Sequence, residues 1–170
     1  GTPQAPTGNT LNIGTVQSTA YNGYISNLRI VRGTAVYTGA FTPATTPLQP
    51  VANTSLLTCA GPSIADKSAN NFTLTRNGDT SVQKFAPFSG TTLTTPYYGT
   101  YFNGSTDYLT AAYNAGTQFG TGDFTLEAWV YLTATPALND SIASVVNDWQ
   151  LSWSTSGFCF MPDASTRQVN

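Results

Sequence analysis

Side chains able to perform acid–base or nucleophilic chemistry are scarce in this chain. Its 170 residues include six Lys and Arg, eight Asp and Glu, two Cys and no His. Without His, neither a Ser-His-Asp triad nor a Cys-His pair can form, and zinc sites that need imidazole are excluded. Cys59 and Cys159 lie far apart and lack a CxxC partner, so they are either two buried thiols or a disulfide that the sequence cannot assign.

Glu127 is the only Glu of the chain, so a catalytic role for it has to be weighed. Glycoside hydrolysis requires a second carboxyl within about 5 to 9.5 Å. Asp123 shares the strand face of Glu127, but four residues of extended chain separate them by about 13 Å. Asp148 on another strand stays open as a partner. The alternative is a structural Glu127 that accepts hydrogen bonds, and we expect the protein not to be an enzyme.

The elements that must position these residues are predicted to be strands. Apolar and polar residues alternate in short runs bounded by Gly, Pro, Asn and Asp, which is typical of strands. The clearest run is 124–132, with Phe124, Leu126, Ala128 and Val130 on one face. Asn77-Gly78 is a hairpin-type turn signal. The other predicted strands are 11–16, 24–32, 55–59, 72–75, 82–88, 97–102, 108–110, 149–153 and 158–161.

Turn signals every 8–12 residues between short strands predict an all-β fold, built as an antiparallel sandwich or barrel. The stretch 137–146 fits a helix or a strand equally well. Segment 41–50 contains three prolines, which cannot donate ladder hydrogen bonds, and it is predicted to be a linker or a surface crossing.

The composition excludes several classes of protein. Hydrophobic residues make up 40% of the chain and charged residues 8%, which argues against disorder. A net charge of -2 argues against the basic surface that binds a nucleic acid or an anionic membrane. No apolar run approaches the length of a membrane-spanning helix. A surface rich in Thr, Asn and Gly with few charges is typical of virion or extracellular β-proteins.

Two segments together resemble a known domain family. Residues 101–109 (YFNGSTDYL) and 119–130 (FGTGDFTLEAWV) look like the opening of a laminin-G-like, or concanavalin A-like, domain. In that family an "FDGxxDYL" hairpin precedes an "F-T-hydrophobic-E-x-W-V" strand, and Asn103 here replaces the usual Asp. Residues 23–30 are similar to a strand near the end of the same domain type. The resemblance implies an antiparallel jelly-roll β-sandwich.

The order of these segments has two interpretations. Residues 1–41 would be the closing strands of one copy, 42–53 a Pro/Thr-rich linker, and 54–170 the opening part of the next copy. Such junctions resemble those in tandem repeats of marine phage structural and tail-fibre proteins, and the chain would be a fragment of an array. The alternative is one permuted domain over 1–170, because sandwich termini often lie close together. Pairing of 24–31 with 124–132 in one sandwich would favour permutation.

We expect no cofactor, and calcium is the one metal that the composition allows, because it takes oxygen ligands; the resemblance to laminin-G-like domains implies a calcium site near one rim. Asp66, Asn70 and Asn71 look like the family's "D-x-S-G-N" segment, and Asp107 lies in the other opening turn. Carboxylate and amide oxygens are suitable calcium ligands, so Asp66, Asn70 and Asp107 are the candidate metal ligands. The alternative is that Asp66 and Asp107 cap turns by accepting backbone hydrogen bonds.

The expected function follows from the resemblance and the missing catalytic groups. It is a non-enzymatic virion module of a phage tail or fibre, which binds a host-surface glycan or assembles an appendage with other copies or virion proteins. The alternative is an extracellular bacterial adhesive repeat that forms filaments by strand pairing; a degenerate glycan hydrolase is the third hypothesis. Four aromatic residues near turns would stack on a sugar, fill the core or contact a neighbouring subunit: Tyr97, Tyr98, Tyr113 and Trp149.

Overall fold

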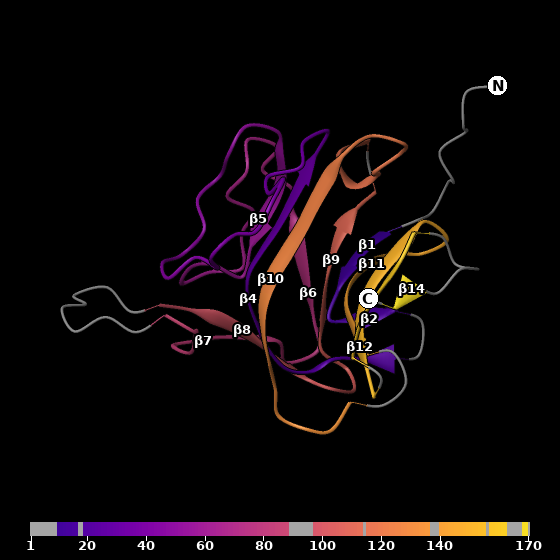
Figure 1. The fold of residues 1–170 in the computed structure, drawn as a ribbon. Coiled ribbons are helices and arrows are strands. Elements are labelled where there is room, and N and C mark those ends of the chain that lie inside the picture. Colours follow the sequence, from indigo (N-terminus) through magenta and orange to yellow (C-terminus); the bar gives the residue numbers. More distant parts are fainter. Residues whose placement is uncertain are drawn as a thin grey trace.

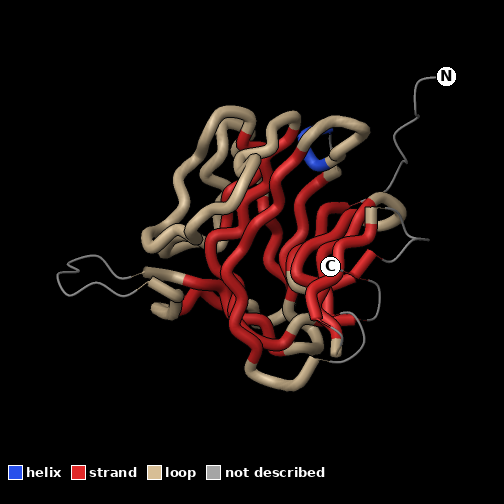
Figure 2. The backbone as a smooth tube through the Cα atoms, viewed as in Figure 1, coloured by secondary structure: helices blue, strands red, loops and turns tan. Residues whose placement is uncertain are grey.

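Regular structure in the computed structural model consists almost entirely of strands. The structure describes residues 10–16, 19–88, 97–113, 115–136, 140–155, 157–162 and 168–169. Within these ranges the single helical element is a 3-10 turn, η1 (Ala115–Thr117), and Figure 2 shows it beside a body of strands joined by loops.

The strands form two main antiparallel sheets (Figure 1). The seven-stranded sheet has the order β14 (Gln168–Val169), β13 (Gly157–Met161), β12 (Trp149–Ser154), β11 (Asp140–Val145), β1 (Thr10–Ile13), β9 (Tyr108–Ala112), β6 (Leu74–Asn77). The five-stranded sheet has the order β10 (Phe124–Leu132), β4 (Asn22–Arg32), β8 (Gly99–Asn103), β7 (Ser81–Gln83), with β5 (Thr54–Thr58) also paired to β4. A small ribbon joins β2 (Thr15–Val16) to β3 (Thr19–Ala20). The predicted all-β antiparallel sandwich is confirmed, while the jelly-roll connectivity stays a prediction.

The central strand of the smaller sheet is β4. One of its edges pairs with β10 along the whole strand, from Phe124 opposite Arg32 to Leu132 opposite Gly23. Its other edge pairs first with β8 and then with β5. In the larger sheet β1 lies between β9 and β11. Strands from the first 32 residues are therefore interior members of both sheets, the arrangement expected of one permuted domain; the division into two copies stays a prediction.

The hydrophobic core lies between the two sheets. Leu11, Ile30, Phe102, Leu109 and Ile142 come from five different strands and are all fully buried. The predicted alternation of β10 holds, because its core-facing positions pack against this cluster: Phe124, Leu126, Ala128, Val130 and Leu132. Alternating side chains thus point inward because each strand presents every second residue to one face.

The hairpin predicted at Asn77-Gly78 is wrong. A turn does form there, with Gly78 at a φ of 65°, but the strands on either side do not pair with each other. Instead, β6 pairs with β9 and β7 pairs with β8. The turn after β6 and the turn between β8 and β9 are corners that carry the chain from one sheet to the other. A turn signal specifies local backbone geometry, not which sheet each strand joins.

Three other segments differ from or refine the expectations. Of the ambiguous stretch 137–146, the described part forms strand β11, and 137–139 lie outside the described residues. The strand predicted over 82–88 ends at Gln83. The proline-rich segment is a surface crossing: it is anchored where buried Leu48 donates its N–H to Asn27 Oδ1 at 2.8 Å.

Both cysteines are buried thiols that are not joined in a disulfide, as in the first of the two alternatives. Burial raises the pKa of the Cys59 thiol to about 11, which keeps it protonated at neutral pH. Among the described residues no helix is long and apolar enough to span a membrane.

Candidate functional site

The Asp66 carboxylate accepts a hydrogen bond from the edge of β5 that does not pair with β4. Its Oδ1 accepts the backbone N–H groups of Leu57 (3.0 Å) and Ser68 (2.8 Å), and its Oδ2 accepts Ser68 Oγ (2.8 Å) and the N–H of Phe72 (2.9 Å). All these donors belong to the chain itself, and the Asp66 side chain is buried. A calcium ion bound here would have to displace donors that now stabilise the loop, so the geometry is that of a capping residue.

Asn70 continues the same cap. Its Nδ2 donates to the carbonyl of Ser55 at 2.9 Å, and Ser68 Oγ donates to the same carbonyl at 3.0 Å. The N–H of Lys67 also donates to the carbonyl of Leu57. Segment 66–70 therefore covers the edge of β5 that β4 does not pair, which protects it from other strands.

Asp107 serves a different part of the fold. Its Oδ1 accepts the N–H of Asp79 at 2.7 Å, and its Oδ2 accepts the N–H of Asn103 at 3.2 Å. It thereby ties together the two corners that connect the sheets. A Cβ on Gly78 would meet this carboxylate, which explains glycine there. Asp66 and Asp107 thus bind different segments, and within the described part of the chain no three His, Cys, Asp or Glu side chains cluster to hold a metal.

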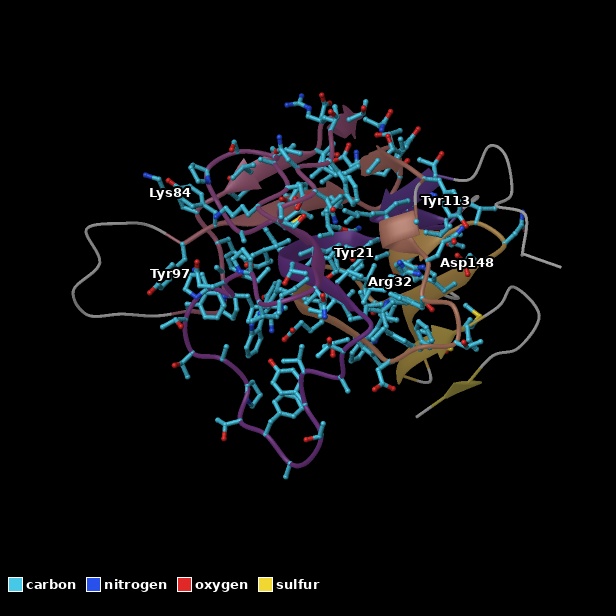
Figure 3. The ribbon with its side chains drawn as sticks, turned by 90° about the horizontal axis from the view of Figure 1, so that it is seen from above. Tyr21, Arg32, Lys84, Tyr97, Tyr113 and Asp148 are labelled. Atoms are coloured by element: carbon cyan, nitrogen blue, oxygen red, sulfur yellow. The ribbon has the colours of Figure 1, made fainter. Side chains whose placement is uncertain are left out.

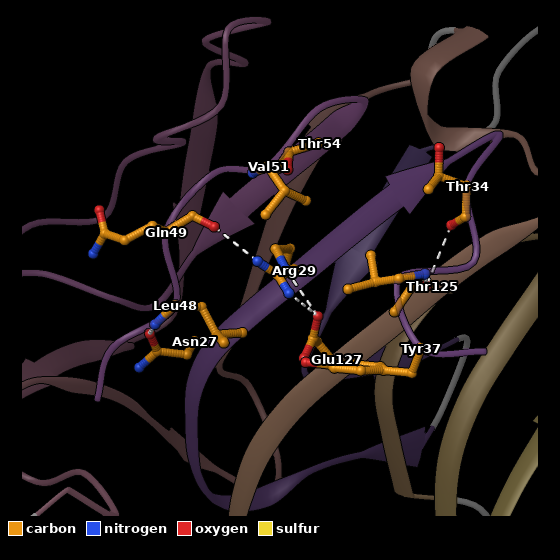
Figure 4. A network of polar contacts seen from close by, with 11 residues as sticks. Asn27, Arg29, Thr34, Tyr37, Leu48, Gln49, Val51, Thr54, Thr125 and Glu127 are labelled. Carbon is orange, nitrogen blue, oxygen red and sulfur yellow. Dashed lines mark hydrogen bonds and ion pairs between the residues drawn. The ribbon is translucent and has the colours of Figure 1, made fainter. Parts of the chain in front are cut away.

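An ion pair joins β4 to β10 on the outer face of the small sheet (Figure 4). Arg29 donates from Nη2 and Nε to Glu127 Oε1 at 2.6 and 2.8 Å, and from Nη1 to the carbonyl of Gln49 at 2.7 Å. The hydroxyl of Tyr37 donates to Glu127 Oε2 at 2.9 Å. Burial and this hydrogen bond raise the pKa of Tyr37. The network binds the crossing segment 33–53 to the sheet.

The position of Glu127 does not fit a glycosidase carboxylate. Its two oxygens accept hydrogen bonds from the Arg29 guanidinium and the Tyr37 phenol, so both are already used to hold side chains of the chain itself. Asp148, the partner left open by the sequence, lies in the turn between β11 and β12 of the other sheet. Desolvation raises the pKa of Asp148, but Glu127 faces away from the core that separates the sheets. The two carboxyls therefore do not flank a common cleft.

An aromatic groove runs along the outer face of β10 and is called the β10 groove below. One hollow of about 400 Å³ lies over residues 125–129, and a second of about 110 Å³ lies over residues 129–131; Trp129 lines both. The side chains of Phe41 and Tyr131 are 57% and 56% exposed. The groove is lined by Tyr24, Ser26, Tyr37, Phe41, Pro43, Ala44, Leu48, Phe85, Ala86, Pro87 and residues 125–131.

Cross-strand register builds the aromatic end of this groove. Tyr131 of β10 lies opposite Tyr24 of β4, which in turn lies opposite Tyr101 of β8. Phe85 packs over Tyr24 with ring centroids 4.2 Å apart and lies 5.0 Å from Tyr131. At the other end Tyr37 and Phe41 stack at 3.9 Å with nearly parallel rings. Rings from three strands and two loops therefore meet on one face.

The four aromatic residues singled out from the sequence differ in burial and in their contacts. Trp149 is 2% exposed, donates its indole N–H to the carbonyl of Thr117 and contacts Phe119 in the core. Tyr113 also packs against the core. In Figure 3, Tyr97 lies at the end of the molecule away from Tyr113. Its ring contacts Phe88, which in turn contacts Trp129. Of the three roles left open for these rings, Trp149 therefore has that of filling the core. The backbone carbonyl of half-buried Tyr98 accepts a hydrogen bond from Ser26 Oγ.

Sequence reasoning missed the β10 groove because its rings are distant in sequence. The one available signal was the alternation of β10, which placed Trp129 and Tyr131 together on the face opposite the core. A separate cleft of about 990 Å³, lined by both polar and apolar residues, lies between loops and includes Arg32, Asn70 and Phe119. Comparisons with protein-family models, curated proteins and solved structures found no match for the chain.

The Arg29–Glu127 pair predicts a measurable stability effect. Glu127→Gln is expected to lower the free energy of unfolding by about 3 kcal/mol, because it leaves Arg29, whose side chain is 5% exposed, without its counter-charge. The double variant Arg29→Met/Glu127→Leu should lose less than the two single variants combined. Urea denaturation measures the parent chain, Glu127→Gln, the single variants Arg29→Met and Glu127→Leu, and the double variant. A Glu127→Gln variant as stable as the parent chain would contradict the structural role.

The Asp66 cap predicts a loss of stability that does not depend on calcium. Asn at this position offers one acceptor oxygen, so Asp66→Asn should cost about 2–3 kcal/mol through buried donors left unpaired. Asp79→Asn, at an exposed carboxylate, is the matched control. Thermal unfolding with calcium and with chelator makes the comparison. If calcium stabilises the parent chain and not Asp66→Asn, the residue is a metal ligand and the capping account fails.

Proposed function

We propose that the protein is a non-enzymatic binding module of a virion, in a phage tail or fibre, and that it binds a host-surface glycan. The β10 groove is the observation that carries this proposal. Exposed aromatic patches mark interaction sites, and Tyr and Trp rings offer large, rigid contact surfaces at low entropic cost. A pyranose ring presents an apolar face that can stack on such a ring.

The polar groups of the groove suit an uncharged or weakly charged sugar. Glu127 is neutralised by Arg29, so the floor has no net charge. Thr125 and Tyr37 add hydroxyl groups, and Ser26 adds a third at the aromatic end. Each of these hydroxyls already donates within the chain, to Thr34, Glu127 and Tyr98 respectively, so toward a sugar it acts as a hydrogen-bond acceptor. The low overall charge and hydroxyl-rich surface support a virion or extracellular location.

Weak single sites are effective when a structure carries several of them. Tail and fibre proteins occur in multiple copies, and linked sites gain avidity through effective concentration without new contacts. The resemblance to laminin-G-like repeats supports the same proposal. An extracellular bacterial adhesive repeat is the second candidate, favoured by the outer edge of β10, which pairs with no strand in the described part of the chain.

A glycan array followed by titration calorimetry tests this function. The chain is expected to bind a defined glycan, and Trp129→Ala and Tyr131→Ala should each weaken binding by about tenfold or more, equivalent to about 1.4 kcal/mol. Tyr108→Ala, a half-buried tyrosine on the outer face of the other sheet, is the matched control. Arg32→Ala tests whether the glycan instead binds in the separate cleft that includes Arg32.

Three outcomes would overturn the proposal. They are the absence of any bound glycan, binding that survives both groove variants, and binding that only Arg32→Ala weakens. Release of reducing sugar from a bound glycan would restore the hydrolase hypothesis.

A further inference from the structure

The cleft between the loops is large enough for a small molecule and is separate from the β10 groove. Its volume of about 990 Å³ lies at the upper end of the range typical of small-molecule sites. The cleft and the groove share no lining residue. Stretches of chain that are distant in sequence meet in the cleft: residues 32–33, 50–55, 69–70, 116 and 119–122.

The one charged side chain among the described residues that line this cleft is Arg32, the last residue of β4 (Figure 3). It is exposed, and within the described ranges its side chain makes neither a hydrogen bond nor an ion pair. The guanidinium of Arg29 differs, because Glu127 and the carbonyl of Gln49 hold it in place. The N–H donors of Arg32 are therefore left to solvent or to a ligand. We call this site the Arg32 cleft.

A neighbouring carboxylate does not neutralise Arg32. Asp123 lies close along the backbone, since its carbonyl accepts the N–H of Gly33 at 2.6 Å. Its carboxylate, however, does not line the cleft, and no ion pair joins it to Arg32. The cleft therefore contains one uncompensated positive charge in the described part of the chain.

Glycines leave room along the loop side of the cleft. A Cβ added to Gly33, Gly120 or Gly122 would meet no atom within 4 Å. Gly33 and Gly120 have φ values of 74° and 62°, which by themselves favour glycine. Gly122 has no positive φ, so neither its backbone conformation nor its packing requires glycine. A side chain there would occupy space that a ligand can use.

Backbone and side-chain groups of the lining suit a polar ligand with an apolar face. The backbone N–H groups of 120–122 donate to no group in the described chain, and such N–H groups supplement a cationic side chain in binding an oxyanion. Thr121 adds an exposed hydroxyl and Asn53 an exposed amide. Pro50 and Val51, which is 41% exposed, add aliphatic surface that packs against the apolar face of a sugar ring.

We propose that the Arg32 cleft binds a carboxylate-bearing molecule of sugar size, such as a hexuronic acid, with the carboxylate on the guanidinium. The planar fork of an arginine matches a carboxylate and pairs with it through two parallel hydrogen bonds. One guanidinium balances the single charge of a carboxylate, whereas a phosphate monoester carries more negative charge than one guanidinium balances. This site does not depend on the β10 groove, and either can bind its ligand without the other.

Amide chemical shifts of the full chain during titration with glucuronate test the proposal. Saturable shifts are expected at Arg32 and at residues 120–122, but not at Trp129 or Tyr131 of the groove. Glucose, which has a hydroxymethyl group in place of the carboxylate, is the matched neutral probe and should bind at least tenfold more weakly. A glucose phosphate tests the other oxyanion. This readout uses the unsubstituted chain, so it does not depend on whether variants fold.

Two matched pairs of variants locate the site. Arg32→Gln should weaken glucuronate binding at least tenfold because it removes the counter-charge, while Arg76→Gln, at an exposed arginine of β6 in the other sheet, should not. Gly122→Leu should block the cleft. Gly39→Leu is its control, because Gly39 also has no positive φ and open space around its Cβ position.

Several results would overturn the proposal. They are the absence of saturable shifts with glucuronate, equal binding of glucose or of the glucose phosphate, and binding unaffected by both Arg32→Gln and Gly122→Leu. Shifts confined to Trp129 and Tyr131 would also overturn it and would support the β10 groove instead. Glucuronate binding in the cleft of a chain whose groove binds no glycan would support the present proposal while overturning the proposed function.

Discussion

The pairing of β4 with β10 is the interaction on which the rest of the structure depends. β4 is eleven residues long and has strands on both edges, so it holds the smaller sheet together. The same register places Arg29 opposite Glu127 and Tyr24 opposite Tyr131. One set of backbone hydrogen bonds therefore positions the core face, the buried ion pair and the aromatic groove. A shift of one residue would move all of these to the wrong face.

The few carboxylates of this protein close and connect its sheets. Asp66 covers an edge of β5, Asp107 joins two corners, and Glu127 neutralises a buried guanidinium. Each accepts hydrogen bonds from groups that would otherwise lie unpaired in a poorly solvated place, which is costly. The outer face of β10 is left with aromatic rings, hydroxyls and a neutralised carboxylate, the observation on which the proposed binding role rests. By contrast, the outer edge of β10 is not paired with any described strand.

Local alternation made much of the fold predictable. It defined 124–132 as a strand and assigned Leu126 and Trp129 to opposite faces, because period-2 patterning reflects burial directly. It could not show that the Asn77-Gly78 turn is a corner, since that depends on pairing between distant strands. The aromatic groove was hidden for the same reason: Tyr24, Phe85 and Tyr131 meet only through register. The three roles left open for Trp149 could not be ranked, because nearness to a turn in the sequence says little about burial.

Nuclear Overhauser contacts between β4 and β10 test the central claim most directly. In the full chain, backbone protons of Ile30 should contact those of Leu126, and backbone protons of Ile25 should contact those of Val130. A mixture of differently labelled chains should show that these contacts arise within one molecule. Contacts seen only between molecules, or a β4 segment without contacts to β10, would contradict the account.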